Sequence, residues 1–259
     1  MKTLGLALSA GGSRGVAHIG FLQALEEEGV APSYIAGSSM GAVVGAAYAY
    51  GLTAAEIRKA VLGLHLRDLL SVKHRRGGLF GTDKMRNLLK RYLGEAYFSD
   101  LKIPFCAVAV DMCTQSIVEC KEGSVLDAVV ASATIPAVFH PLEKEGMRLI
   151  DGGILERVPV PQVKAMGADI VVAVDVLGQK ACSKEKHPGT LSVVFDTFDI
   201  LDNYKTRRKR KDNEKIIDFW LEPDLGDMNQ YKLKRLQFAY DKGYEIGKAN
   251  APSIKKALR

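Results

Sequence analysis

The chain has 259 residues, a formal net charge of +6 at pH 7, and 47% hydrophobic and 25% charged side chains. This length is sufficient for one full hydrophobic core, and the composition is typical of a globular protein. Mean hydropathy is close to zero, and no window reaches the roughly 18 uncharged apolar residues that a membrane-spanning helix needs. These numbers exclude an integral membrane protein, so we expect a soluble or at most peripheral one.

The four cysteines, Cys106, Cys113, Cys120 and Cys182, show no Cys-x-x-Cys spacing that would indicate a zinc site. The first three fall in or beside predicted strands, where a free thiol behaves as a small hydrophobic side chain. The apolar run over residues 4–10 is too brief for a secretory signal and leads directly into a glycine loop. We therefore expect a cytoplasmic protein with reduced thiols, no metal ion and no cofactor.

The first fifth of the chain alternates apolar runs with helical patterns, which predicts a largely parallel sheet covered by helices. Its predicted elements are a buried strand, a glycine-rich turn, a helix, a second strand, a serine-containing turn and a small-residue helix, at residues 3–9, 10–15, 16–28, 32–37, 37–41 and 41–49.

The rest of the chain continues this α/β pattern. Helices are predicted over 53–64, 82–92, 124–133, 191–204 and 228–248, and strands over 105–110, 117–120, 148–150, 170–176 and 216–221. No internal repeat or low-complexity linker divides the sequence. We predict one domain over 1–259, with a motif-bearing core at 4–176 and a C-terminal extension of strand and helix at 177–259.

The pentapeptide Gly37-Ser38-Ser39-Met40-Gly41 has the Gly-x-Ser-x-Gly pattern of a nucleophile elbow. Small residues two positions before and after Ser39 allow a tight turn between the apolar strand and the following helix. Such a turn exposes the serine hydroxyl at the positive end of the helix. Ser39 is therefore the candidate nucleophile, although it needs a base and an oxyanion site to act as one.

The glycine-rich turn Gly11-Gly12-Ser13-Arg14-Gly15 follows a predicted strand and opens a helix, so its backbone amides can converge on an anion. A nucleotide-phosphate loop is the alternative. Against this alternative, the turn lacks the Lys-Ser/Thr ending of a P-loop, and Ala10 breaks a strict G-x-G-x-x-G pattern. The neighbouring serine turn favours an oxyanion loop, in which Arg14 braces the loop or adds positive charge.

The base is the harder assignment. His187 is the one histidine after Asp151 and lies in a polar segment, while His18, His65, His74 and His140 occupy positions typical of structural or exposed side chains. A strand, by contrast, delivers Asp151 into Gly152-Gly153, where a sharp turn can follow. A carboxylate in a dry pocket can accept the serine proton directly. A simple β-turn is the alternative reading of Asp-Gly-Gly.

These motifs together resemble the patatin-like phospholipase family, specifically its compact bacterial members. Residues 10–15 look like the family's oxyanion motif, 37–41 like its nucleophile elbow and 151–153 like its Asp-Gly-Gly base motif. Residues 131–141, Ala-Ser-Ala-Thr-Ile-Pro-Ala-Val-Phe-His-Pro, are similar to its Ser-x-Ala-x-Pro-x-x-Phe-x-Pro segment. Four motifs in this order over roughly 140 residues are specific. Ala10 and Ser13 depart from the residues commonest in the family's loop.

The resemblance implies a three-layer α/β/α fold with a mostly parallel central sheet, and a Ser39-Asp151 dyad without a catalytic histidine. It implies hydrolysis of lipid acyl esters through an acyl-Ser39 intermediate and without a metal. The loop at Gly11, Gly12, Ser13 and Arg14 would bind the oxyanion. Five glycines would support the motifs: Gly15, Gly37, Gly41, Gly152 and Gly153.

Three alternatives remain open from the sequence. The first is a regulatory or lipid-binding protein on the same fold with weak or vestigial hydrolysis, since fold does not establish turnover. The second is acyl transfer to an acceptor other than water, because both reactions share the acyl-serine. The third is a Ser-His-Asp triad that uses His187.

Most of the excess positive charge lies in one run over residues 205–211, formed by Lys205, Arg207, Arg208, Lys209, Arg210 and Lys211. A solvated helix end is the plainest interpretation of such a run. Nucleic acid is not an expected partner, because no interleaved aromatic residues or known binding fold accompany it. For a lipid hydrolase, the hypothesis is peripheral contact with an anionic membrane, at about 1 kcal/mol per basic residue.

Overall fold

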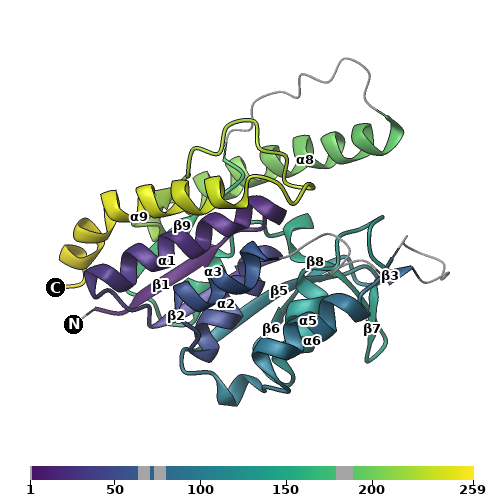
Figure 1. Ribbon diagram of the computed structural model, residues 1–259, viewed down its shortest axis with the longest axis horizontal. Helices are drawn as coiled ribbons and strands as arrows, with labels where there is room; N and C mark the ends of the chain where they lie inside the picture. Colours follow the sequence, from purple (N-terminus) through teal and green to yellow (C-terminus); the bar gives the residue numbers. More distant parts are fainter. Residues whose placement is uncertain (1, 64–70, 73–79, 179–188) are drawn as a thin grey trace.

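The computed structural model describes residues 2–63, 71–72, 80–178 and 189–259. Its strands are β1 (Leu4–Leu8), β2 (Tyr34–Ser38), β3 (Ser71–Val72), β4 (Phe80–Gly81), β5 (Phe105–Asp111), β6 (Ser116–Cys120), β7 (Leu142–Lys144), β8 (Met147–Asp151), β9 (Ile170–Val174) and β10 (Phe219–Leu221). Its helices are α1 (Ala17–Glu28), α2 (Met40–Tyr50), α3 (Ala54–Leu62), α5 (Asp83–Leu93), α6 (Val125–Ser132), α7 (Val160–Ala165), α8 (Thr190–Asp212) and α9 (Leu236–Ala257) (Figure 1).

The central sheet has the order β10-β9-β1-β2-β5-β8-β7, with β6 also paired to β5. The five strands from β10 to β5 run parallel, and β6, β7 and β8 join by antiparallel pairing. Every residue of β1, β5 and β9 is buried, as expected for parallel strands covered on both faces. The sheet is therefore mixed, with helices on both sides, and the predicted fold class is confirmed.

The two faces of the sheet carry different amounts of hydrophobic core. From β1, Leu4, Leu6 and Leu8 point into the larger core, which they share with α1, α2, α3, α5, α6 and α9. Ala7 points to the other face, where a smaller cluster includes Val160 and Val163 of α7. Alternation along the strand places small side chains under the short helix and large ones under the thick layer.

The last helix, α9, packs directly along α1 (Figure 1). The backbones approach so closely that a Cβ at Gly243 would lie 1.8 Å from the Ala17 carbonyl oxygen, and one at Gly20 would lie 2.0 Å from that of Tyr240. The Lys2 amide also donates to the Leu258 carbonyl at 3.1 Å. These contacts join the C-terminal extension to the first helix of the chain and support the prediction of one domain.

Three predicted elements of the extension differ from the structure. The helix expected over 191–204 continues without a break through the basic run, to Asp212. The strand expected over 216–221 is shortened to β10, because residues Glu214–Ile216 form a 3-10 turn. The helix expected over 228–248 begins instead at Leu236 and ends at Ala257.

Four residues discussed above, His65, His74, Cys182 and His187, lie outside the described residues. The triad alternative through His187 is therefore untested. Among the described helices, none combines the length and apolarity that crossing a membrane requires.

Candidate active site

Ser39 sits at the turn between β2 and α2 with φ 53° and ψ −120°. Positive φ is unusual for a residue with a side chain and marks the strained backbone of a nucleophile elbow. The turn closes against β1 so tightly that a Cβ at Gly41 would lie 2.1 Å from the Leu8 carbonyl oxygen. At Gly37 the same atom would lie 2.4 Å from the Gly41 carbonyl oxygen. The two glycines of the motif are required by close approach.

Asp151 ends β8, and its carboxylate meets the serine. The Ser39 hydroxyl donates to Asp151 Oδ2 at 2.6 Å, while the Gly153 amide donates to Oδ1 at 2.8 Å. Asp151 is 7% exposed and Ser39 is 4% exposed. A Cβ at Gly152 would lie 2.1 Å from the Val108 carbonyl oxygen. The turn after Asp151 can therefore pack against β5 only because residue 152 has no side chain. The structure thus brings the predicted nucleophile and base together.

Burial raises the pKa of Asp151 to about 6. The hydrogen bonds from Ser39 and Gly153 oppose this rise, because they stabilise the ionised form. The Asp202 carboxylate raises the pKa further and the Lys205 ammonium lowers it. A carboxylate with a pKa near 6 is ionised at neutral pH and still basic enough to take a hydroxyl proton during a reaction.

The glycine-rich turn lies between β1 and α1 beside Ser39. The Ser13 amide donates to the Gln230 carbonyl at 2.9 Å and the Arg14 amide to the Gly11 carbonyl at 3.0 Å, so these two donors are engaged. The amides of Gly11 and Gly12 donate to no residue that the structure describes. Gly12 has φ +51° and lies against the Gln230 carbonyl, which leaves no room for a side chain. Of the four residues predicted to bind the oxyanion, Gly11 and Gly12 have amides without a described acceptor, whereas the amides of Ser13 and Arg14 already donate to carbonyls.

Arg14 and Gly15, which are both buried, support the loop by close packing. Arg14 is 2% exposed, and burial lowers its pKa although the Asp175 carboxylate opposes this effect. Gly15 lies against Met40, the residue after the nucleophile, where a Cβ would come within 2.4 Å of the methionine Cγ. His18 completes this support: its Nε2 bonds the Ser9 carbonyl at 2.9 Å, and burial lowers its pKa to about 4. A neutral, structural His18 agrees with the sequence interpretation.

Ser132 belongs to the segment at 131–141, and no role was predicted for it from the sequence. In the structure its hydroxyl accepts from the Ser39 amide at 2.9 Å and donates to the Val108 carbonyl at 2.6 Å. This bridge ties the nucleophile's backbone to β5, which also pairs with the strand that carries Asp151. A buried serine at the end of an apolar helix needs polar partners. Because the sequence already predicted such a helix over 124–133, it could have indicated a structural role for Ser132.

Lys205 of α8 reaches the turn that carries the base. Its ammonium donates to the carbonyls of Gly153 at 3.0 Å and Ile154 at 2.6 Å, and it pairs with Asp202 at 3.1 Å. The Asp-Gly-Gly turn is thereby held from both sides, by the Asp151 carboxylate and by α8. Nothing in the sequence distinguished Lys205 from its basic neighbours.

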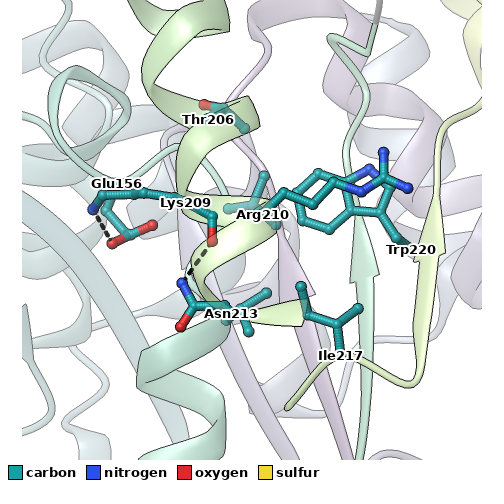
Figure 2. Close-up of a pocket in the computed structure, with 9 residues that line it drawn as sticks. Glu156, Thr206, Lys209, Arg210, Asn213, Ile217 and Trp220 are labelled. Carbon is teal, nitrogen blue, oxygen red and sulfur yellow. Dashed lines mark hydrogen bonds and ion pairs between the residues drawn. The ribbon is translucent and has the colours of Figure 1, made fainter. Parts of the chain in front are cut away.

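The remaining basic residues divide into those that have an acidic partner and those that have none among the described residues. Lys209 pairs with Glu156 at 2.5 Å, and the Arg210 guanidinium lies 4.7 Å from the centre of the Trp220 ring and 3.0 Å from the Glu222 carboxylate. Figure 2 shows Lys209 beside Glu156 and Arg210 against Trp220. These residues line a hollow of about 10 Å³, which is room for one water molecule. The run is therefore not uniformly a solvated helix end: Arg207, Arg208 and Lys211 are the exposed members without an acidic partner among the described residues.

Ser39 opens on an apolar cavity of about 300 Å³. Val43 of α2, Met85 and Leu89 of α5, and Val138 and Phe139 after α6 contribute to its walls. This volume is within the range of small-ligand sites and its lining is almost wholly aliphatic or aromatic. The cavity can hold a hydrocarbon chain with its reacting end at the serine.

A second pocket of about 240 Å³ shares Ser39 with the first and also contains Asp151. Its far wall is α8, which contributes Asp199, Asp202 and Lys205. Gln230 and Tyr231, whose side chains both donate to Asp199, line both pockets. Ser39 and Asp151 thus lie where the apolar cavity meets a second pocket, which is mostly apolar and carries charged side chains on its α8 wall.

Comparison with known proteins identifies the family. The patatin-like phospholipase family model matches residues 6–164, which is more than half of the chain. The chain belongs to the patatin-like phospholipase family. An NTE family protein of Mycobacterium tuberculosis is 38% identical over 178 residues, which are 68% of this chain and 49% of that protein.

Two further comparisons extend over nearly the whole chain. Patatin-like phospholipase domain-containing protein 6 of Homo sapiens is 26% identical over 276 residues, covering 96% of this chain and 20% of that protein. The crystal structure of VipD from Legionella pneumophila covers 98% of this chain and 67% of its own, with a TM-score of 0.68 and 14% identity, and so shares the fold. The chain spans about half the length, or less, of the curated relatives it matches.

The patatin-like match contains the elbow, the glycine loop and the Asp-Gly-Gly turn, and it ends in α7. The polar wall formed by α8, with Asp199, Asp202 and Lys205, lies beyond it. This part of the site is therefore described by the structure of this chain and not by the family match. Among the described residues, no group of three or more His, Cys, Asp or Glu side chains could hold a metal ion.

Proposed function

We propose that the protein hydrolyses carboxylic esters of lipids, with Ser39 as nucleophile and Asp151 as general base. One observation carries the proposal: the 2.6 Å hydrogen bond from the Ser39 hydroxyl to Asp151, at the mouth of an apolar cavity of about 300 Å³. A serine that is strained, buried and bonded to a raised-pKa carboxylate has the features of an activated nucleophile. Membership of a phospholipase family supports a lipid ester as the substrate.

In the proposed mechanism, Ser39 Oγ attacks the ester carbonyl carbon while its proton passes to Asp151 Oδ2. The amides of Gly11 and Gly12 stabilise the oxyanion of the tetrahedral intermediate. When this intermediate collapses, the leaving alcohol takes the proton from Asp151. Water then attacks the acyl-Ser39 ester while Asp151 accepts a proton from it. When the second tetrahedral intermediate collapses, Asp151 returns this proton to Ser39 Oγ, the acid is released, and both residues regain their starting states.

The two pockets suggest how the two halves of the substrate bind. In this proposal the acyl chain occupies the apolar cavity beside Val43, and the alcohol portion occupies the second pocket beside the charged side chains of Lys205 and Asp202. The scissile bond then lies at the junction of the two pockets, over Ser39. A phospholipid or lysophospholipid has this division into an apolar chain and a charged head, so we infer that such lipids are the substrate class.

A fluorophosphonate probe tests the nucleophile, because it reacts with activated serines. We expect one label per chain in the native protein, on Ser39, and labelling and short-chain ester hydrolysis reduced by at least about 10³-fold in Ser39→Ala and Asp151→Asn. Ser38→Ala is the matched control, since it removes the neighbouring hydroxyl, and labelling should persist.

Circular dichroism checks that each variant is folded. Full hydrolysis by folded Ser39→Ala would contradict the proposal, and turnover that needs His187 would favour the triad. Labelling without turnover on p-nitrophenyl esters, lysophospholipids and diacyl phospholipids would favour a lipid-binding or regulatory protein. Product analysis with an added alcohol acceptor separates hydrolysis from acyl transfer.

A further inference from the structure

Helix α8 exposes an unusual amount of apolar surface. Of the nine large hydrophobic side chains that are exposed in the described part of the chain, six lie on this helix: Val193, Val194, Phe198, Ile200, Leu201 and Tyr204. Ile200 is 68% exposed, Tyr204 65% and Leu201 61%. Single exposed apolar residues are ordinary, but a contiguous group on one helix marks an interaction surface.

Some of the exposed residues of α8 form one stripe that changes character along the helix. The stripe follows one helical face at intervals of four, three, four, four and three residues, through Val193, Thr197, Ile200, Tyr204, Arg208 and Lys211. Its one polar residue before Arg208 is Thr197, whose hydroxyl donates to the Val193 carbonyl of the same helix at 2.8 Å. The stripe is otherwise apolar from Val193 to Tyr204 and cationic from Arg208 to Lys211, and we call it the α8 stripe.

Opposite the α8 stripe, the same helix forms part of the active site. Phe198 and Leu201 line the second pocket, which contains Asp151, and Phe195 lines the apolar cavity. Phe198 and Leu201 are also 38% and 61% exposed, so they connect the stripe with the entrance to the pocket. Figure 1 shows α8 at the edge of the molecule, with its N-terminal half extending beyond the helices that cover the sheet.

We propose that the α8 stripe docks the protein on an anionic lipid surface, so that the dyad takes its ester directly from that surface. Val193, Ile200 and Tyr204 enter the boundary between headgroups and acyl chains, and Arg208 and Lys211 contact lipid phosphates. The role given to docking, which is to supply ester to Ser39, rests on the proposed function. Binding to the lipid surface does not itself require hydrolysis.

Charge distinguishes a lipid surface from a second copy of the chain. Two copies paired in parallel along their α8 stripes would bring Arg208 and Lys211 against their own counterparts. Pairing them antiparallel would place these cations on the apolar half of the partner. An anionic membrane instead offers an apolar layer beneath a negative one, which accepts both halves of the stripe at once.

The test uses full-length protein with Ser39→Ala, which prevents lipid turnover, and flotation with vesicles of phosphatidylcholine alone or with phosphatidylglycerol. Ile200→Asn with Tyr204→Asn should weaken binding to both vesicle types by roughly tenfold or more. Arg208→Gln with Lys211→Gln should weaken binding to the anionic vesicles by roughly tenfold and remove most of its salt dependence.

Matched controls remove the same chemistry elsewhere. Tyr92→Asn with Met112→Asn deletes two exposed apolar side chains, which are 42% and 43% exposed. Lys234→Gln with Lys256→Gln removes two exposed positive charges. Both pairs should bind within about twofold of the Ser39→Ala parent. Equal loss of binding in a control pair and its stripe counterpart would overturn the proposal.

A second readout separates docking from catalysis. With Ser39 intact, the stripe variants should hydrolyse dissolved p-nitrophenyl butyrate normally and lose activity on ester embedded in anionic vesicles. If neither the native protein nor any variant hydrolyses ester, but flotation still depends on the α8 stripe, the proposed function is refuted and docking stays supported. Flotation that is absent, or that the stripe variants do not weaken, would overturn docking, as would a dimer in sedimentation that the stripe variants dissolve.

Discussion

At Ser39 and Asp151, the local sequence determines the backbone conformation of the serine turn, and the strand order of the sheet determines the contact between the two side chains. The strained φ of 53° at Ser39 follows from the elbow motif and its two glycines. The 2.6 Å contact with Asp151 follows from the pairing of β5 with both β2 and β8, which brings residues 112 positions apart together. Both residues were predicted from the sequence because each lies at a strand end, beside glycines that have no other evident purpose.

The pH dependence of hydrolysis reports on the base. Because burial raises the pKa of Asp151 to about 6, the protonated and inactive form accumulates as the pH falls through that value. We expect kcat/KM for p-nitrophenyl butyrate to be constant above about pH 7 and to fall tenfold per pH unit well below 6.

Two substitutions should move this acid limb in opposite directions. Lys205→Gln removes a positive charge that lowers the pKa of Asp151, so the limb should shift to higher pH. Asp202→Asn removes a negative charge that raises it, so the limb should shift to lower pH. Lys256→Gln, which removes an exposed positive charge in the last turn of α9, serves as the control. Shifts in the same direction, or none, would mean that the limb belongs to another group.

At the scale of elements, α8 is the part that the sequence described least well. The helix was predicted over 191–204, running into a basic run at 205–211 that was interpreted as a solvated helix end. In the structure Lys205 and Lys209 turn inward to carbonyls and to Glu156, which removes much of the repulsion that would break the helix. Such pairing depends on which elements pack against α8, and no local pattern encodes it.

The boundaries of α9 have a similar explanation. Residues just before Leu236 line the site, and the Gln230 carbonyl accepts a hydrogen bond from the Ser13 amide. The helix continues past Pro252 because Ala251 and Ile254 are almost fully buried. Their burial offsets the roughly 3 kcal/mol that proline costs inside a helix. Tertiary packing overrides the local signals at both ends.

The apolar cavity yields a prediction about chain length. Val43 lies on the α2 face that borders the cavity beside Ser39, so Val43→Phe should fill part of it. We expect kcat/KM for a p-nitrophenyl ester of a twelve-carbon acid to fall by roughly tenfold or more, while the butyrate stays within about threefold. Val118→Phe, on β6 and outside the cavity lining, is the matched control. An unchanged ratio between the two esters would place the acyl chain elsewhere.

For the whole molecule, the sequence was sufficient for the fold class and for the approach of Ser39 to Asp151, because both depend on strand order and on motifs at strand ends. It could not predict the antiparallel β7, which is three residues long, or the second pocket beside Asp151, whose far wall comes from α8. One domain over 1–259 and a cytoplasmic location stay predictions, the first supported by the packing of α9 on α1. The central claim is that this assembly acylates Ser39.

Mass spectrometry of the protein quenched in acid during turnover of a p-nitrophenyl ester tests that claim most directly. We expect a mass increase of one acyl group, confined to the peptide that contains Ser39 and absent in Ser39→Ala. An acyl group on any other residue, or sustained turnover by folded Ser39→Ala, would contradict it.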